Sequence, residues 1–414
     1  MITFEMPEHV LKSTERFKKV AVEVMRADAH MLDEGEHERP LNYINAMWPL
    51  VKDQYAERLE QIKAGDQKKA GPRWDLLENI LMIEALSWGD SGQYLCRPTP
   101  SLGGAAIEAV GTSEQKIRLF SRWTEDPPKW GSMAITEPGA GSDNSSMLTN
   151  ARLDPDTNEW IINGEKIFIT NGKLALDESE GLCVVWATID PEAGRAGIKS
   201  FVIESTAQGV TIAKQEHKLG IRASDTVSLV FQNVRVPYDN LLGTADVVQK
   251  KTGTKGFKGA MQTFNASRPS IAASAMGVAR AALEFTTATL AEQGVEVDYR
   301  KPPYEWTAVE RDLIEMESRY KAAWNLTLKA TSQMVHGQNN RMEASMCKYR
   351  AGEAVTWITQ KAVELLGPIG YSRDILVEKW MRDAKINDIY EGTRQINQLI
   401  VARSILGYSR RELK

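Results

Sequence analysis

The chain has 414 residues, 42% of them apolar, which is ordinary for a water-soluble globular protein with two or three domains. Its 51 Lys and Arg residues nearly balance 55 Asp and Glu residues, so the net charge of −4 predicts no binding to nucleic acid. The N-terminal segment carries charges throughout, and no apolar run approaches the length of a membrane span. We therefore expect a cytoplasmic protein without membrane insertion.

The cysteines and histidines point away from a disulfide framework and from a metal site. Cys96, Cys183 and Cys347 are odd in number and far apart, which favours reduced thiols. The five histidines include no pair at the helical spacing of metal ligands. His30 and His37 lie near acidic residues in HMLDEGEH (30–37), but a solvated loop explains this segment better. We expect no metal.

Residues 1–130 have the periodicity of an all-α domain. The segment LKSTERFKKVAVEVMRADAHML (11–32) is amphipathic. In WDLLENILMIEALSWGD (74–90), Leu77, Leu81, Ile83 and Leu86 lie on or near one helical face.

From residue 131 to residue 243 the apolar period changes to two, which predicts a central β domain with orthogonal sheets or a barrel-like form. Asn163-Gly164 lies between two β-branched and aromatic runs and predicts a tight hairpin. Further expected strands are LCVVWATID (182–190), IKSFVIE (198–204) and TVSLVFQNVRVP (226–237).

Residues 244–414 return to helical spacing. Three long apolar stripes begin near Ile271, Val309 and Cys347, and a fourth helix begins at Thr393. Helices with one apolar stripe each predict a C-terminal four-helix bundle. The expected fold class is therefore α+β, with the order α, β, α.

Three short segments could carry chemistry, although each also has a structural explanation. The loop MAITEPGAGSDNSS (133–146) could bring backbone N–H groups and the Thr136 and Ser142 hydroxyls to a flat polar ligand or a phosphate, or be a surface turn. In KIFITNG (166–172), Phe168 and Thr170 could line one side of a ligand, or Phe168 could fill the core.

The third segment is IYEGT (389–393). Tyr390 can shield Glu391 from water, and Gly392 has no side chain to keep a ligand away, as a catalytic base would require. Alternatively, Glu391 complements the dipole of the helix that Thr393 caps.

Taken together, these segments resemble the acyl-CoA dehydrogenase family. Its motifs stand here as AITEPGAGSD, KIFITNG, KLGIRASDTVSLVFQNVRVPYDNLLG, NASRPSIAASAMGVARAALE and KWMRDAKINDIYEGT. They occur in the family's order between about residues 85 and 409. The resemblance implies FAD bound between the β domain and the bundle, and oxidation of an acyl-CoA thioester to its trans-2-enoyl form.

The resemblance also implies a role for each matching residue. Glu391 is the base, as in short- and medium-chain relatives, since Ser267 stands where other relatives carry the base. Residues expected at FAD are Met133, Ile135, Thr136, Ser142, Phe168, Ile169, Thr170, Thr393 and Gln395. Residues expected at the substrate are Ser142, Arg268, Tyr390 and Gly392.

Two segments depart from the family pattern at the part of the FAD site that a neighbouring subunit completes. AEQGVEVDYRKPPYEW (291–306) lacks the family's Arg-x-x-Phe-Gly, and Glu364 and Pro368 replace the expected glutamine and one glycine. Arg300 or Lys301 could substitute, or FAD could bind less tightly.

The sequence leaves the acyl group open. Gln93 stands where relatives that oxidise glutaryl-CoA carry arginine, which argues against that activity. Arg97 could face a polar or carboxylated acyl tail, or be salt-bridged or solvent-facing. The basic run at 249–259 could contact CoA phosphates, or be a solvated loop.

The expected partners are an electron-transfer flavoprotein and a second copy of the chain, in a homodimer or homotetramer. The alternatives are an acyl-CoA oxidase, other flavin chemistry on a specialised acyl-CoA, or a non-catalytic member of the family.

Overall fold

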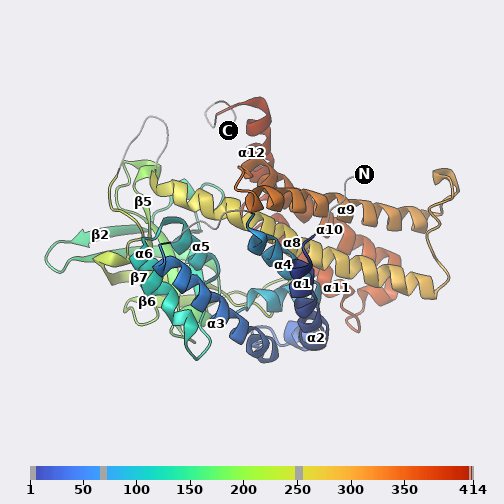
Figure 1. The fold of residues 1–414 in the computed structure, drawn as a ribbon, viewed down its shortest axis with the longest axis horizontal. Coiled ribbons are helices and arrows are strands. Elements are labelled where there is room, and N and C mark those ends of the chain that lie inside the picture. Colours follow the sequence, from blue (N-terminus) through green and yellow to red (C-terminus); the bar gives the residue numbers. More distant parts are fainter. Residues whose placement is uncertain (1–5, 66–71, 248–254, 410–411, 413–414) are drawn as a thin grey trace.

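A computed structural model describes residues 6–65, 72–247, 255–409 and 412, with the backbone alone at 255–265 (Figure 1). The N-terminal region is helical, as its periodicity predicts. Its α-helices are α1 (Glu8–Val20), α2 (Arg26–Glu34), α3 (Leu41–Lys63), α4 (Trp74–Leu95), α5 (Ser101–Val110) and α6 (Ser113–Phe120).

The middle of the chain forms one curled mixed sheet. Its strands are β1 (Gly131–Ala134), β2 (Asn150–Asp154), β3 (Glu159–Thr170), β4 (Leu182–Thr188), β5 (Ile198–Glu204), β6 (Val210–Gln215) and β7 (Thr226–Pro237). Their order is β1-β4-β2-β3-β7-β6, and β5 pairs with β4. The short helix α7 (Gly172–Leu176) follows β3.

The predicted hairpin at Asn163-Gly164 is wrong. β3 runs through both residues, and its pairing with β7 shifts register there because the chain bulges. Gly164 has φ +149°, and a Cβ atom at this position would lie 2.4 Å from Thr149 Oγ1. The glycine therefore allows a bulge and a close approach inside one long strand rather than a turn.

The C-terminal region contains α8 (Lys255–Glu292), α9 (Ala308–Val335), α10 (Arg341–Tyr371), α11 (Val377–Ala384) and α12 (Arg394–Leu406). Small and apolar residues of α8, α9 and α10 form one buried core. The N-terminal helix α4 packs along α8, so the helical body is shared between both ends of the chain. α12 lies against α10 and projects beyond the other helices (Figure 1).

A buried charged cluster joins the N-terminal region, the β domain and the C-terminal region. Lys379 of α11 contacts Asp90 of α4 at 2.6 Å and Asp383 of α11 at 2.5 Å. Asp383 also accepts a hydrogen bond from the backbone N–H of Ile221, in the connection before β7. The three side chains are at most 5% exposed. This contact fixes the β domain against the segment that leads to Glu391.

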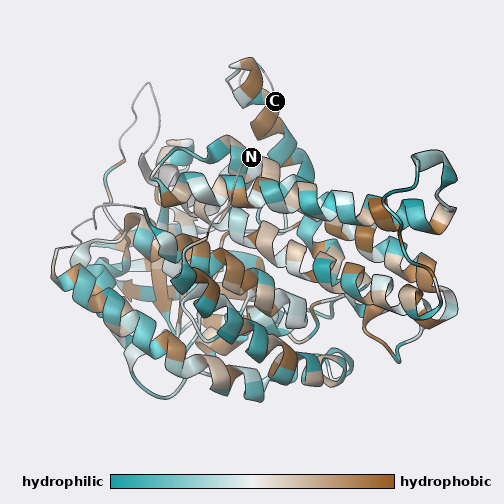
Figure 2. Ribbon diagram, turned by 45° about the vertical axis from the view of Figure 1, so that its right-hand side comes forward, coloured by the Kyte–Doolittle hydropathy of each residue, from teal (hydrophilic) through white to brown (hydrophobic). Residues whose placement is uncertain are grey.

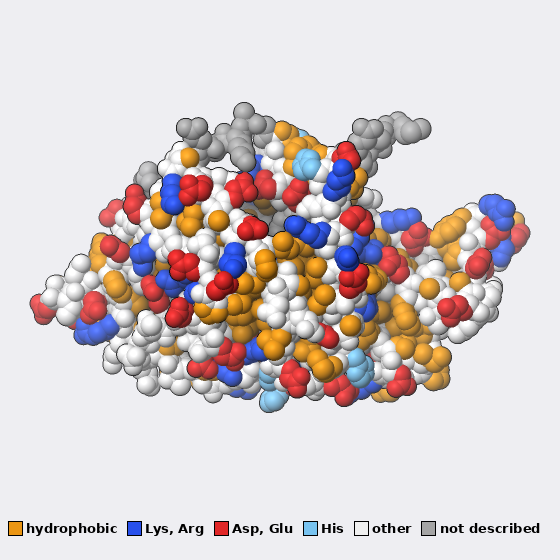
Figure 3. Space-filling view, turned by 60° about the horizontal axis from the view of Figure 1, so that its bottom comes forward, with side chains coloured by type: hydrophobic (Ala, Val, Ile, Leu, Met, Phe, Trp, Pro, Cys, Tyr) orange, Lys and Arg blue, Asp and Glu red, His pale blue; other side chains and the backbone are white. Residues whose placement is uncertain are grey.

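The surface agrees with the balanced composition. Apolar and polar residues alternate along the helices, as expected when one face of each helix is buried (Figure 2). One face of the molecule mixes both signs of charge around apolar side chains that gather toward its middle (Figure 3). Within the described ranges, no helix has the length and apolarity that a membrane crossing requires.

Candidate active site

The segment 388–393, called the base loop below, connects a 3-10 turn (Lys385–Asp388) to α12. Glu391 and Gly392 both have left-handed backbones, with φ values of +57° and +94°. Left-handed backbone is uncommon outside glycine and, where it occurs, is held by its surroundings. Asn397 supports the loop by donating to the Gly392 carbonyl at 2.8 Å, and Thr393 caps α12 by accepting from the Ile396 N–H.

The Glu391 carboxylate lies against α8. Ser267 donates a hydrogen bond from Oγ to Glu391 Oε2 at 2.5 Å. Burial raises the pKa of Glu391 above its ordinary value, although the Ser267 hydrogen bond and the charges of Arg268 and Lys348 oppose the shift. Taken as a whole residue, Glu391 is of intermediate exposure. A half-buried carboxylate with a raised pKa has the properties of a general base.

Two buried cations lie beneath the base loop. Arg268 is 3% exposed and donates to Ser345 Oγ. Lys348 is 1% exposed, and its Nζ donates to the Gly392 carbonyl at 2.7 Å. Burial lowers the pKa of Lys348 to about 8, while the negative charges of Glu391 and Asp388 oppose this shift. The positive charges of both residues act on the Glu391 carboxylate.

The charge of Glu391 acts on two tyrosines, Tyr390 of the base loop and Tyr94 of α4. Tyr390 donates from its hydroxyl to Asn387 Oδ1 at 3.2 Å. Tyr94, at the end of α4, is affected by the charge of Glu391, and burial raises the pKa of Tyr94 to about 12. The shielding of Glu391 from water by Tyr390 stays a prediction.

On the β domain, Phe168 lies on a second bulge of β3. It has φ +59° and is 61% exposed, so the alternative that Phe168 fills the core is wrong. The neighbouring Ile167 N–H donates to the Thr136 carbonyl at 2.9 Å, which brings the loop after β1 beside the exposed ring. An exposed aromatic ring beside the hydroxyls of Thr136 and Thr170 fits a flat polar cofactor such as a flavin.

The other residues expected at the cofactor differ in accessibility. Met133 and Thr170 are half-buried, Ile135 is nearly buried, and Ser142 and Gln395 are exposed. Ile169 is 1% exposed and belongs to the core of the β domain. Its side chain therefore packs inside the protein, and only its backbone can face a ligand.

The loop after β1 is anchored by a buried ion pair that the sequence analysis missed. Lys166 Nζ contacts Glu137 Oε1 at 2.8 Å, and the Glu137 carboxylate accepts from the Leu148 and Thr149 N–H groups. Burial lowers the pKa of Lys166 to about 8. The only signal in the sequence is a charged residue in each of two motifs, which does not reveal that they pair.

The segments that depart from the family pattern satisfy their charges locally. Arg300 pairs with Asp298 at 2.9 Å and Lys301 with Glu310 at 3.1 Å. Glu364 pairs with Lys361 at 2.5 Å. Arg300 and Lys301, suggested as substitutes at FAD, are therefore already engaged by neighbouring side chains.

The residues considered for the acyl tail are also accounted for. Gln93 is buried and donates to the Met25 carbonyl at 2.7 Å. Arg97 donates to Gln54 Oε1 of α3 at 3.0 Å, a neutral and exposed partner. Of the basic run 249–259, residues 249–254 lie outside the described residues and 255–259 are described by backbone alone.

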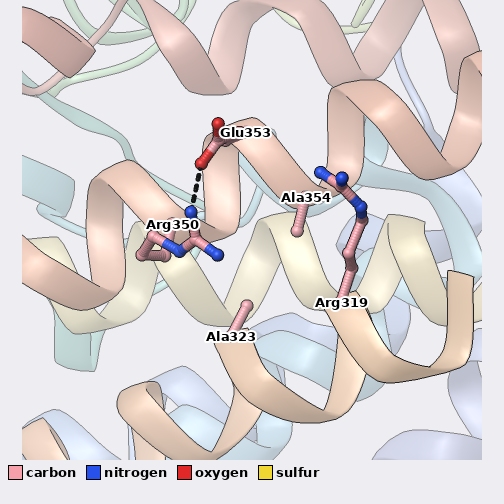
Figure 4. A pocket seen from close by; sticks show the side chains of 5 residues that line it. All are labelled: Arg319, Ala323, Arg350, Glu353 and Ala354. Carbon is pink, nitrogen blue, oxygen red and sulfur yellow. Dashed lines mark hydrogen bonds and ion pairs between the residues drawn. The ribbon is translucent and has the colours of Figure 1, made fainter. Parts of the chain in front are cut away.

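Two further features lie apart from the base loop. A small pocket between α9 and α10 is lined by Arg319, Ala323, Arg350, Glu353 and Ala354, and Arg350 pairs with Glu353 at 2.6 Å (Figure 4). It contains none of the expected site residues.

The second feature is a group formed by Glu36, His37 and His217. In this group Glu36 pairs with Arg222 and accepts from the Lys218 N–H. The Arg222 charge opposes the binding of a cation, and the Lys218 N–H occupies one of the carboxylate oxygens that would bind it.

Comparisons with known proteins identify the family. The middle domain of acyl-CoA dehydrogenase matches residues 132–234, and the C-terminal domain of acyl-CoA dehydrogenase matches residues 254–406. The short-chain specific acyl-CoA dehydrogenase of Megasphaera elsdenii is 35% identical over 80% of this chain and 82% of its own length. The NADH-dependent acryloyl-CoA reductase of Anaerotignum propionicum is 35% identical over 73% of this chain and 72% of its own.

Solved structures of the same family have a similar fold. Butyryl-CoA dehydrogenase from Megasphaera elsdenii has a TM-score of 0.82 and 30% identity, covering 98% of this chain and 100% of its own. A chain from work on the electron transferring flavoprotein of Acidaminococcus fermentans has a TM-score of 0.82 and 29% identity, with the same coverage. The protein described here therefore belongs to the acyl-CoA dehydrogenase family of FAD-dependent oxidoreductases.

Proposed function

We propose that this protein oxidises an acyl-CoA thioester to the trans-2-enoyl-CoA, with Glu391 as the base. The observation that carries the proposal is the Glu391 carboxylate, half-buried on a left-handed loop, with a raised pKa and a hydrogen bond from Ser267. A thioester α-proton is weakly acidic, so its removal requires a positioned base whose pKa is near the working pH.

In this reaction the α-C–H bond breaks and its proton passes to Glu391. We propose that the backbone N–H of Glu391 stabilises the negative charge that develops on the thioester oxygen. A bound FAD supplies the acceptor for the β-hydrogen, which leaves with its electron pair as the new double bond forms. Tyr390 and Gly392 lie at the acyl group in this proposal. Tyr390 excludes water from the carboxylate, and Gly392 leaves room for the thioester beside it.

The cofactor residues are proposed from two parts of the chain, the β domain and the start of α12. Exposed Phe168 and the Thr136 and Thr170 hydroxyls suit the flavin ring, together with Met133, Ile135 and the Ile169 backbone. Ser142, Thr393 and Gln395 suit the polar part of FAD, because Thr393 begins α12 and a helix N-terminus favours anions.

We further propose a short-chain acyl-CoA as substrate and an electron-transfer flavoprotein as electron acceptor, by similarity to the butyryl-CoA dehydrogenase and to the Acidaminococcus chain. The three described cysteines are free and buried, which fits a reducing compartment such as the cytoplasm. A homodimer or homotetramer is proposed by resemblance to the family.

The test is anaerobic reduction of the purified flavoprotein by a panel of short, branched, aromatic and dicarboxylic acyl-CoAs. We expect at least one short acyl-CoA to bleach the flavin and to yield the enoyl-CoA. A yellow protein that no acyl-CoA bleaches would overturn the proposal. Rapid formation of hydrogen peroxide in air would favour the oxidase, and a colourless protein that does not take up FAD would favour a non-catalytic member.

A further inference from the structure

Lys348 is a buried cation next to the proposed base, and the reaction as described above does not use it. It lies on α10, is 1% exposed, and donates to the carbonyl of Gly392, the residue that follows Glu391. Lysine is rarely buried without a carboxylate in direct contact. Among the described residues, Lys348 Nζ donates its hydrogen bond to this carbonyl rather than to an acidic side chain.

We infer that Lys348 is a positioning residue for the base: its ammonium group fixes the base loop and keeps Glu391 ionised and able to accept a proton. This inference rests on the proposed role of Glu391. It goes beyond that role because it states that Lys348 controls both the backbone geometry of the base loop and the charge state of Glu391.

The geometric part follows from the base loop. Its left-handed residues, Glu391 and Gly392, persist only when their surroundings hold them. Two side chains donate hydrogen bonds to the Gly392 carbonyl. They are Lys348 from α10 and Asn397 from α12. Because the two donors come from different helices, they fix the loop from two directions.

The electrostatic part follows from the groups that face Glu391. Ser267 and Arg268 approach from α8, Lys348 from α10, Tyr94 from α4, and Tyr390 from the loop itself. The charge of Asp388 also acts on Lys348.

When Glu391 is ionised, two cations (Arg268 and Lys348) balance two carboxylates (Glu391 and Asp388). Burial favours protonated Glu391, and the cations oppose burial. Without the lysine charge, burial would prevail more strongly, and a larger fraction of Glu391 would be protonated at neutral pH.

The test measures the rate of flavin reduction against pH for the holoenzyme and for three variants at this position. K348M removes the charge and the hydrogen bond, K348Q removes the charge but keeps a donor, and K348R keeps the charge. We expect the acid limb of the profile to move upward by about 1 pH unit in K348M and K348Q. We expect K348R to stay near wild type. At high pH, where Glu391 is ionised in every form, K348Q should approach the wild-type rate, whereas K348M should stay below it because it lacks a donor to the Gly392 carbonyl.

Lys361→Met is the matched control, because Lys361 lies on the same helix but pairs with Glu364 at the surface. It should leave the profile unchanged. A uniform loss of rate in K348M and K348Q without a shift of the acid limb would overturn the inference and leave a purely structural lysine. So would a shift in K348R equal to that in K348M.

If K348M fails to fold, as judged by its thermal transition and flavin content, K348Q against K348R still decides the result. Failure of wild type to react with any acyl-CoA would instead contradict the proposed function. The two failures are therefore distinguishable.

Discussion

The base loop and the connection at 293–307 belong to the same helical region, but they hold their charges in opposite ways. Near the base loop, Arg268 and Lys348 are buried and lie close to a carboxylate whose charge burial disfavours. In the connection, Arg300 is 91% exposed and pairs with Asp298, two residues away.

The two regions differ in whether their charged side chains are buried or exposed. Buried charges are costly unless several neighbours are placed correctly, so they persist where a function depends on them. Exposed ion pairs stabilise little and tolerate change. Glu364 and Pro368, which depart from the family pattern, are exposed, whereas Arg268 and Lys348 near Glu391 are buried.

The largest expected effect is at the base itself. In E391Q the amide keeps the size of the side chain but cannot accept the α-proton, so flavin reduction should slow by about 10²–10⁴-fold. Flavin content and acyl-CoA binding should remain, as measured by absorbance and by equilibrium titration. Bleaching at nearly the wild-type rate would remove Glu391 from its proposed role.

The backbone of the base loop can be tested with a matched pair of glycines. G392A places a Cβ atom at φ +94° and should destabilise the protein by about 1–2 kcal/mol while slowing flavin reduction. G407A, at φ +69° just after α12 and with open space around it, should have a similar effect on stability but none on the rate. Equal rates in both variants would show that the loop geometry does not matter for the reaction.

The raised pKa of Glu391 predicts a change in stability with pH. A carboxyl group whose pKa is higher in the folded state than in the unfolded state contributes stability at low pH, and this contribution is lost as the pH rises through the folded pKa. Glutamine has no ionised form, so E391Q should melt above wild type at neutral and higher pH, and the difference should vanish in acid. E364Q, which removes an exposed carboxylate, should show no such trend in the same thermal scans.

The exposed connection should respond weakly. R300A removes a cation that pairs with a neighbour at the surface, so the melting temperature and the flavin content should equal those of wild type. K301A leaves the buried Glu310 carboxylate without its lysine, so it should lower the melting temperature slightly and leave the flavin content unchanged. Loss of FAD from either variant would show that the connection does reach the cofactor, and would reverse the contrast between the two regions.

The smallest effect is expected at Arg97. Arg97 donates a hydrogen bond to the neutral Gln54, so R97A should change the ratio of rates with dicarboxylic and simple acyl-CoAs by less than about twofold. A residue that binds a substrate carboxylate would change this ratio by more than about tenfold. The measurement is the same anaerobic flavin reduction with both substrates.

The sequence predicted the sites whose signal is local. Apolar spacing placed the long helices, and the motif at 389–393 identified the carboxylate that the structure shows half-buried with a raised pKa. Asn163-Gly164 misled because the same dipeptide suits a hairpin turn and a bulge, and only the pairing partner on β7 decides between them.

Lys348 was missed for a different reason. It stands beside the apolar stripe of α10, next to Cys347, where a lysine that extends to solvent would look the same. Its burial depends on the base loop, 44 positions away in the sequence. Ser267 was recognised only as unable to act as the base, and its hydrogen bond to Glu391 is a tertiary contact without a local signature.

The contact of Lys379 with Asp90 and Asp383 has a consequence for dissecting the protein. A fragment that starts at residue 254, where the match to the C-terminal family domain begins, would keep Lys379 and Asp383 but lack Asp90 and the Ile221 N–H. In this fragment, Lys379 and Asp383 would pair with each other but would lose the other contacts that stabilise them in the intact chain. Evolutionary modules and autonomous folding units need not coincide here, and expression of that fragment should yield an aggregating or partly unfolded species.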